Sequence, residues 1–349
     1  MFHKLTIAAV RRETADCVSL AFAVPHHLSA TFAFSPGQYL TLRATIAGVE
    51  TRRSYSLCGL PGELRVAIKH VPDGLFSHFA NTELTAGDML DVMQPEGRFG
   101  AAPGARTMLA IAAGSGITPI VALLRAALAA NPNSDCVLLY GNRSVADIIF
   151  RTELEDLKDR HLGRLAVIHI LSREEQDIPI LNGRIGPDKL TALLPTLLRP
   201  NSVDHAYICG PGDLIDSATT TLVALGIPPE RIRTERFTPA TPRAPRSTPT
   251  APPRATPFAT ATIIHDGKTN EIPLAEGEPI LDAAIRAGLD LPWSCRGGMC
   301  STCRAKLTQG AAIMAENYAL EPWETEAGYI LTCQAHPTTP HVTIDYDHV

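Results

Sequence analysis

The feature that most constrains this chain is a group of four cysteines near its C-terminus. Three of them follow the spacing C-x4-C-x2-C, and a fourth lies far downstream. This is the plant-type spacing of 2Fe–2S ligands, whereas structural zinc favours two C-x2-C pairs and only one occurs here. A 2Fe–2S cluster carries single electrons, so the pattern indicates electron transfer rather than a zinc site or a disulfide pair. The expected ligands are Cys295, Cys300, Cys303 and Cys333.

Two further motifs lie upstream of the cysteines. Residues 53–56 read Arg-Ser-Tyr-Ser, and residues 114–119 read Gly-Ser-Gly-Ile-Thr-Pro. In these motifs the chain resembles the ferredoxin–NADP reductase family, whose flavin motif is R-x-Y-S and whose nucleotide loop is G-x-G-x-x-P. The resemblance covers nearly the whole chain except a Pro-rich segment. Together with the cysteines it implies a reductase component of a multicomponent oxygenase.

The first motif predicts a flavin site. Arg53 can pair with a phosphate, Tyr55 can lie flat against the flavin ring, and Ser56 can hydrogen-bond its reactive edge. A second segment, Gly-Leu-Phe-Ser at residues 74–77, is expected to open a helix. The backbone N–H groups at the start of that helix suit a pyrophosphate. An ordinary strand with an exposed arginine is the alternative. By resemblance the flavin is FAD, although the residues alone leave FMN open. The expected flavin residues are Arg53, Ser54, Tyr55, Ser56, Gly74, Phe76 and Ser77.

The second motif predicts a nicotinamide nucleotide site. It follows a strand and opens a helix, which is the context that such a loop needs. A later strand ends at Cys209, on the sheet edge where ligands gather. The resemblance implies that this cysteine lies beside the nicotinamide, and a buried core cysteine is the alternative. The expected nucleotide residues are Gly114, Ser115, Gly116, Thr118, Pro119, Gly210 and Pro211.

The end of the second strand of this region bears on the choice of nucleotide. NAD sites often place an acid there to hold the ribose 2′-hydroxyl. Here the strand ends in Asn142, Arg143 and Ser144, which include a cation and a hydroxyl but no acid. The sequence therefore favours NADPH and leaves NADH possible. A solvated loop arginine is the alternative.

The nucleotide region ends in Glu235-Arg236-Phe237. The resemblance implies an acid and an aromatic side chain at this place, the aromatic one packing against the flavin. Phe237 as a core residue that closes the last strand is the alternative. The residues expected at the reacting centre are Ser56, Cys209, Glu235 and Phe237.

The 349 residues are expected to form three domains joined by one linker. Short β-like runs separated by turn signals predict an antiparallel β-barrel FAD domain over residues 1–103. Alternating strands and helices predict an α/β domain with a doubly wound parallel sheet over residues 104–237. Residues 238–257 are rich in Pro, Thr and Ala and are expected to be a linker. Residues 258–349 are expected to form a small α+β ferredoxin domain.

Charge is spread unevenly along the chain. Residues 258–349 hold 5 Lys+Arg and 12 Asp+Glu, whereas the whole chain has a net charge of −5. The acidic C-terminal region suggests electrostatic docking onto a partner, and solubility alone is the alternative. The sequence has no stripe of basic residues of the kind that would predict nucleic-acid binding. No segment is long and apolar enough to span a membrane, and single scattered cysteines favour the cytoplasm.

The resemblance implies an order of electron carriers that runs from NADPH to FAD to the 2Fe–2S cluster and then to a terminal oxygenase. The expected partner is a di-iron oxygenase that acts on phenylacetyl-CoA. A Rieske-type or other oxygenase for an aromatic or steroid substrate is the first alternative. A non-enzymatic redox sensor or scaffold is the second, and three cofactor motifs in one chain argue against it.

Overall fold

The computed structural model describes residues 1–100, 105–237 and 258–348. The chain divides into two compact units, residues 1–240 and 241–349. The predicted linker over residues 238–257 and the predicted boundary at residues 103 and 104 both lie outside the described residues. Those boundaries therefore stay predictions.

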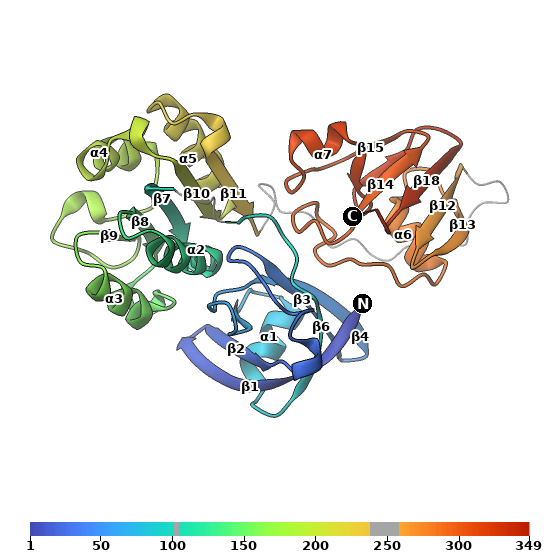
Figure 1. Cartoon of the computed structure of the whole chain (residues 1–349), viewed down its shortest axis with the longest axis horizontal. Helices are drawn as coiled ribbons and strands as arrows, with labels where there is room; N and C mark the ends of the chain where they lie inside the picture. The colour runs from blue at the N-terminus through green and yellow to red at the C-terminus, as the bar shows by residue number, and fades with distance from the viewer. Residues whose placement is uncertain (101–104, 238–257, 349) are drawn as a thin grey trace. The chain divides into compact units, whose positions relative to one another are not determined.

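The first unit begins with a six-stranded antiparallel sheet in the order β4-β3-β6-β1-β2-β5 (Figure 1). Leu57 and Val66 form an antiparallel bridge that joins its two outer strands and curls the sheet into a barrel. One helix, α1 (Leu75–Thr82), contributes Phe76 and Ala80 to the barrel core. The strands are β1 (Phe2–Thr14), β2 (Cys17–Ala23), β3 (Tyr39–Ile46), β4 (Val49–Ser56), β5 (Arg65–Lys69) and β6 (Met89–Met93).

The rest of the first unit is a five-stranded parallel sheet in the order β11-β10-β7-β8-β9. The strand order reverses at β7, as in a doubly wound fold, so the carboxyl ends of β7 and β10 lie at the switch point. The strands are β7 (Thr107–Ala113), β8 (Asp135–Asn142), β9 (Leu165–Leu171), β10 (His205–Gly210) and β11 (Ile232–Arg236). The helices are α2 (Ile117–Ala130), α3 (Arg151–Arg160), α4 (Pro187–Leu197) and α5 (Gly212–Ala224).

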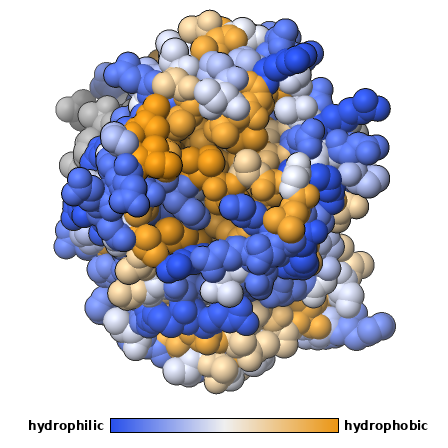
Figure 2. Space-filling view, turned by 90° about the vertical axis from the view of Figure 1, so that its left-hand side faces the viewer, coloured by the Kyte–Doolittle hydropathy of each residue, from blue (hydrophilic) through white to orange (hydrophobic). Residues whose placement is uncertain are grey.

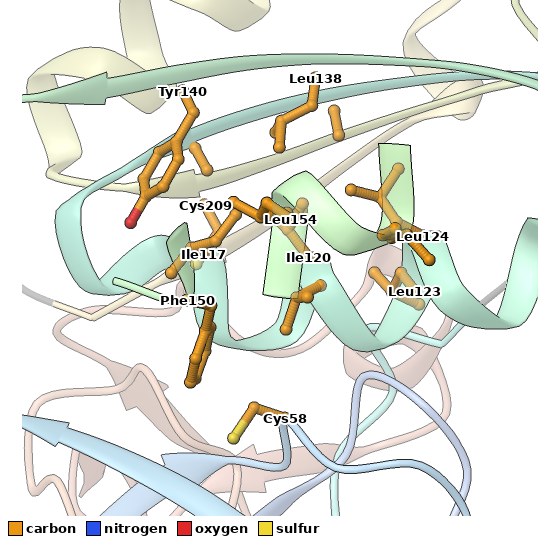
Figure 3. Packing of buried hydrophobic residues seen from close by; sticks show 14 of the residues in the cluster. Cys58, Ile117, Ile120, Leu123, Leu124, Leu138, Tyr140, Phe150, Leu154 and Cys209 are labelled. Atoms are coloured by element: carbon orange, nitrogen blue, oxygen red, sulfur yellow. The ribbon is translucent and has the colours of Figure 1, made fainter. Parts of the chain in front are cut away.

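Side chains of alternate strand residues pack into two different cores. Ala110 and Ala112 of β7 face α2 and α3, whereas Leu109 and Ile111 face α4 and α5. The first of these cores also takes in Cys17, Cys58, Ala67 and Phe99 of the barrel. Figure 3 shows Cys58 facing Phe150 across this shared core. The barrel and the parallel sheet therefore pack as one unit.

One helix begins later than the sequence suggests. The run from Asp147 to Arg160 is expected to be helical, yet α3 begins only at Arg151. Phe150 adopts a left-handed backbone with φ of 60° and buries its ring in the shared core. The apolar residues before Arg151 thus form a packed loop, because their burial outweighs the local tendency to continue the helix.

One edge of the parallel sheet is β9, whose residues from Ala166 to His169 are only half-buried. Figure 2, seen from the side on which α3, α4 and β9 lie in Figure 1, shows apolar side chains gathered within a hydrophilic surround. None of the helices in the described ranges is long and apolar enough to cross a membrane.

The second unit holds a five-stranded mixed sheet in the order β13-β12-β18-β14-β16, with a separate pair β15-β17. β12 and β18 are parallel, and a hairpin turn at Asp266-Gly267 joins β12 to the antiparallel β13. The strands are β12 (Ala259–His265), β13 (Lys268–Leu274), β14 (Arg304–Gln309), β15 (Ala312–Met314), β16 (Tyr329–Leu331), β17 (Ala335–Pro337) and β18 (His341–Asp345). The helices are α6 (Ile280–Arg286) and α7 (Pro322–Glu326).

Candidate functional site

A hydrogen bond joins the flavin motif to the end of the nucleotide-binding sheet. Ser56, the last residue of β4, donates from Oγ to Oε2 of Glu235 in β11 at 2.9 Å. Burial raises the pKa of the Glu235 carboxyl to about 7, although the Ser56 hydrogen bond opposes the rise. The carboxyl group therefore changes its charge near neutral pH, at a place where two parts of the fold meet.

Cys209 lies directly beside Glu235. The two residues are register partners in the parallel pair β10 and β11, so their Cα atoms lie opposite each other. Cys209 is fully buried, and this burial, reinforced by Glu235, holds the pKa of its thiol well above the usual range. The thiol is therefore neutral. The structure brings together Ser56, Cys209 and Glu235, three residues predicted from distant parts of the sequence.

Phe237 follows β11 and is half-buried. It packs at the margin of the shared core that contains Cys209. The contact with the core is what a residue closing the last strand would make. The accessible part of the side chain is what packing against a flavin would need.

The remaining flavin-motif residues line up along β4. The Arg53 guanidinium is exposed and donates to the carbonyl oxygen of Arg52 at 2.7 Å. The Tyr55 ring is half-buried and lies 5.7 Å from the Phe76 ring, centroid to centroid. Ser54 Oγ lies 3.2 Å from Thr41 Oγ1 on β3. The charge of Arg53 and the open part of the Tyr55 ring suit a phosphate and a flat heterocycle.

The turn before α1 fits a pyrophosphate through its backbone. Gly74 caps the helix, and no side chain hydrogen-bonds the first-turn N–H groups. A Cβ atom at Gly74 would lie 2.5 Å from Ser77 Oγ, so only glycine fits. Ser77 Oγ accepts from Val71 N at 3.1 Å and donates to the Gly74 carbonyl at 3.0 Å. The hydroxyl of Ser77 thus shapes the turn, and Phe76 is a buried core residue.

The glycine loop after β7 also offers its backbone to a ligand, here the nucleotide, at positions where the packing requires glycine. Gly114 has φ of +53°, and its carbonyl accepts a 2.9 Å hydrogen bond from the buried Tyr140 hydroxyl. A Cβ atom at Gly116 would lie 2.1 Å from the Cys209 carbonyl oxygen. Thr118 is buried and bonds the Ser115 carbonyl at 3.1 Å, and Pro119 is buried within α2. Gly210 ends β10, and Pro211 precedes α5 without a side-chain cap.

Lys69 of the barrel also lies at this loop, and sequence reasoning missed it. A Cβ atom added to Gly114 would lie 3.9 Å from Lys69 Nζ. The lysine ends β5 and forms an ion pair with Asp16 at 3.5 Å. Its charge lies beside the nucleotide loop although its place in the sequence is far away. The glycine motif itself gives no signal for it.

The ends of β8 and β9, where the sequence predicts the 2′ end of the nucleotide, hold more charges than the sequence suggests. Arg143 is exposed just after β8, and its carbonyl accepts from the N–H of Arg173 at 2.8 Å. Arg173 follows β9, so two exposed arginines lie on neighbouring strand ends. Two acids lie here as well: Asp147 accepts from Ser144 Oγ at 2.6 Å, and Glu174 accepts from Val145 N at 2.8 Å. The absence of an acid noted in the sequence therefore holds only for the strand end itself.

The four predicted cluster ligands converge in the second unit as two pairs. The Cys295 thiol contacts that of Cys300, and the Cys303 thiol contacts that of Cys333. Among residues 1–100, 105–237 and 258–348, no three His, Cys, Asp or Glu side chains could hold a single metal ion. Two cysteines on each of two irons is the arrangement that a 2Fe–2S cluster needs, so pairs fit where a single-ion site does not.

Backbone N–H groups surround these sulfurs. Cys295 Sγ accepts from Gly297 N at 3.3 Å and from Met299 N at 3.4 Å, and Cys300 Sγ accepts from Cys295 N at 3.4 Å. The contact with Cys300, against the effect of burial, lowers the pKa of Cys295 to about 7. None of the eight cysteines, all of them described, forms a disulfide. The donor set is thus thiolate-rich and suited to an iron–sulfur core.

Family descriptions match each of these three parts. The oxidoreductase FAD-binding domain matches residues 4–100, the oxidoreductase NAD-binding domain residues 110–220, and the 2Fe-2S iron-sulfur cluster binding domain residues 263–338. The chain belongs to the family of oxidoreductases that join these domains in one polypeptide. Its cofactors are FAD, a nicotinamide nucleotide and a 2Fe–2S cluster.

Full-length relatives carry more specific names. The chain is 46% identical to a component of the 1,2-phenylacetyl-CoA epoxidase of Escherichia coli K12, over 99% of this chain and 98% of that protein. It is 33% identical to the 3-ketosteroid-9-alpha-monooxygenase ferredoxin reductase component of Rhodococcus rhodochrous, over 98% and 96%. Phthalate dioxygenase reductase shares the fold, with a TM-score of 0.61 and 23% identity over 99% of this chain and 98% of that one.

Proposed function

We propose that the chain is the reductase component of a multicomponent oxygenase, and that it delivers electrons from NADPH to a terminal oxygenase acting on phenylacetyl-CoA. The observation that carries the proposal is the joining of two kinds of site in one chain. Ser56, Cys209 and the half-buried Glu235 come together in a group that we assign to the flavin and nicotinamide site, and we assign the two thiol pairs to the cluster site. When bound, the nicotinamide supplies a hydride, the flavin accepts two electrons and releases them singly, and the cluster carries one.

The chain's own residues would hold and orient these groups. Arg53 and the N–H groups at the start of α1 would bind the flavin phosphates, and Tyr55 would support the ring. The loop from Gly114 to Gly116 would admit the nucleotide backbone, with Lys69 adding charge from the barrel. Ser56 would donate toward the flavin edge or to Glu235, whose protonation state near pH 7 controls where that hydroxyl points. Buried Cys209 would shape the nicotinamide pocket as a neutral thiol.

A preference for NADPH over NADH is part of the proposal. Arg143 and Arg173 are both exposed, on adjacent strand ends, and can flank a 2′-phosphate. Asp147 and Glu174 lie in the same region but already accept hydrogen bonds from the loop. Those bonds hold the acids in place, so we expect the two arginines to decide the choice.

The names of two relatives suggest different substrates for the partner oxygenase, and the higher sequence identity favours phenylacetyl-CoA. The relative named for phenylacetyl-CoA is 46% identical, and the relative named for a ketosteroid is 33% identical. We therefore propose a phenylacetyl-CoA oxygenase of the di-iron class as the partner, and retain a Rieske-type oxygenase as the alternative. A cytoplasmic location is also proposed, because eight cysteines without a disulfide suit a reducing compartment.

Reconstitution tests this proposal. The purified chain, loaded with FAD and iron, should support NADPH-dependent epoxidation of phenylacetyl-CoA when mixed with the oxygenase components of that pathway. A steroid or aromatic-ring dioxygenase system should receive electrons much more slowly. Equal rates with both would argue against a dedicated phenylacetyl-CoA partner, and delivery only to the Rieske enzyme would overturn the choice of substrate.

A further inference from the structure

A glutamine directly follows the fourth cluster ligand. Gln334 comes after Cys333, and its side chain is 0% exposed. Burying a primary amide costs free energy unless its donors find partners. This glutamine is part of none of the sequence motifs discussed above, so its burial beside the cluster ligands needs an explanation.

Three acceptors surround the amide nitrogen of Gln334. Nε2 lies 2.8 Å from the Arg296 carbonyl oxygen, 3.0 Å from the Cys333 carbonyl oxygen and 3.6 Å from Cys333 Sγ. Because all three neighbours accept, the nitrogen rather than the oxygen of the amide must point there. One N–H is thus directed at Arg296, and the other is shared between the carbonyl oxygen and the sulfur of Cys333.

The acceptors belong to two separate segments of the cluster site. Arg296 lies in the loop that begins at Cys295 and carries three of the four cysteines, whereas Cys333 comes from the segment after β16. Gln334 therefore ties the ligand loop to the fourth ligand through one side chain. The same amide group reaches both the backbone of the loop and a ligand sulfur.

Packing fixes the Gln334 side chain from the opposite direction. Gly298 has φ of +78°, and a Cβ atom there would lie 3.2 Å from Gln334 Cγ and 3.0 Å from the Glu316 carbonyl oxygen. The Ala315 N–H also donates to the Gln334 backbone carbonyl at 2.9 Å. The glycine in the loop thus leaves room for the glutamine, which has little freedom to turn away from Cys333.

We propose that Gln334 is a positioning residue that sets the reduction potential of the cluster. Hydrogen bonds to cluster sulfurs stabilise the reduced form, which carries the extra negative charge, and so raise the potential. The bond to Arg296 keeps the loop at the distance at which all four thiolates can bind iron. The inference rests on the 2Fe–2S cluster alone and does not depend on which oxygenase receives the electrons.

The first test replaces Gln334 in the full-length holoprotein. Gln334→Met has a similar length but no N–H donor, so the cluster potential should become more negative and a chelator should remove iron faster. We expect the equilibrium constant for cluster reduction to fall at least threefold, about 28 mV at 59 mV per tenfold factor. A dye-mediated titration followed by electron paramagnetic resonance measures the potential. Gln309→Met is the matched control, because Gln309 is exposed in the same unit and should leave the potential unchanged.

The second test begins with the unsubstituted chain, in which no substitution affects cluster assembly. Protein labelled with ¹⁵N in glutamine side chains should show a nitrogen coupling to the reduced cluster in pulsed electron paramagnetic resonance. That coupling should persist in Gln309→Met and vanish in Gln334→Met. Absence of the coupling in the unsubstituted chain, or an unchanged potential in Gln334→Met with its full two irons, would overturn the proposal.

Discussion

The Ser56 hydroxyl and the Glu235 carboxylate, 179 positions apart in sequence, are joined by a 2.9 Å hydrogen bond. This bond links the last residue of a barrel strand to the outer strand of the parallel sheet. The Arg-Ser-Tyr-Ser motif predicts a role for Ser56 at the flavin, but neither local sequence predicts that Ser56 and Glu235 are in contact. We propose that flavin and nicotinamide meet at this contact, so the protonation state of Glu235 should affect electron transfer between them.

The first prediction concerns pH. Because burial raises the pKa of Glu235 to about 7, the carboxyl is protonated below that pH and charged above it. The rate of flavin reduction by NADPH should therefore show a transition near pH 7, which Glu235→Gln should remove. The raised pKa also stabilises the fold fully below about pH 4.5, and this contribution is lost as the pH rises through about 7. Stopped-flow flavin absorbance from about pH 5.5 to about pH 8.5 measures the rate; an unchanged transition in the variant would assign it to another group.

The second prediction concerns the ion cluster that joins the barrel to the nucleotide-binding sheet. Arg65 of β5 donates to both carboxylate oxygens of Glu153 in α3 at 2.7 and 2.8 Å, and Arg125 of α2 also bonds Glu153. Burial alone would raise the pKa of Glu153, but these arginines lower it to about 2. Its stabilising contribution is thus present above about pH 4.5 and lost as the pH falls toward 2.

Glu153→Ala should therefore lower the free energy of unfolding of the first unit by about 3 kcal/mol at pH 7, since it leaves two buried cations without their shared partner. Arg151→Ala is the control, because its pair with Glu155 is exposed on the same helix and is worth only about 0.3–0.5 kcal/mol. Urea unfolding followed by flavin fluorescence measures both. A loss below about 1 kcal/mol for Glu153→Ala would mean that the ion cluster does not hold the two parts together.

The third prediction separates the cofactors. Cys300→Ser removes one thiolate of the first sulfur pair, so the chain should lose most of its iron. Flavin occupancy should stay near one per chain, because the flavin residues belong to the other compact unit. Iron analysis and flavin absorbance measure the two contents. Cys136→Ser is the control, since Cys136 is a buried core residue of the nucleotide-binding sheet. Loss of flavin together with iron would contradict independent sites.

The fourth prediction concerns nucleotide choice. Arg143→Ala and Arg173→Ala should each raise KM for NADPH about tenfold, the effect of losing ~1.4 kcal/mol, and change KM for NADH little. Steady-state dye reduction with each nucleotide measures this. An equal effect on both nucleotides in both variants would mean that neither arginine contacts the 2′-phosphate.

The sequence predicted the fold well wherever a motif or a hydrophobic period lies within one short segment. The first three cysteines, the Arg-Ser-Tyr-Ser strand and the glycine loop each lie within a few residues, and they predict the ferredoxin, FAD and nucleotide parts. The apolar run from Ile117 to Ala130, directly after the glycine loop, is likewise a local pattern, and it forms α2. The start of α3 was not predicted correctly, because the left-handed backbone at Phe150 follows from tertiary packing.

The functional residues that the sequence did not predict were missed for a different reason. Lys69, Arg173 and Gln334 act through contacts with segments far away in sequence, and none of them belongs to a motif of fixed spacing. Gln334 is adjacent to a ligand, yet its significance depends on the loop at Arg296 that reaches it only after folding. Glu174 was missed for the same reason, since the turn after β9 brings it to Val145, 29 residues earlier. Asp147 lies only three residues after Ser144, but beyond the strand end at which an acid is expected.

The most direct test of the central claim is to remove residues 258–349 and compare two activities of the remaining flavoprotein. The account predicts that NADPH oxidation with a small dye acceptor stays largely intact, because the flavin and nucleotide residues lie in the first unit. Electron delivery to the terminal oxygenase, measured as substrate oxidation, should be abolished, because the cluster is the outlet. Substrate oxidation at the full rate without the ferredoxin region would contradict the account at its last step.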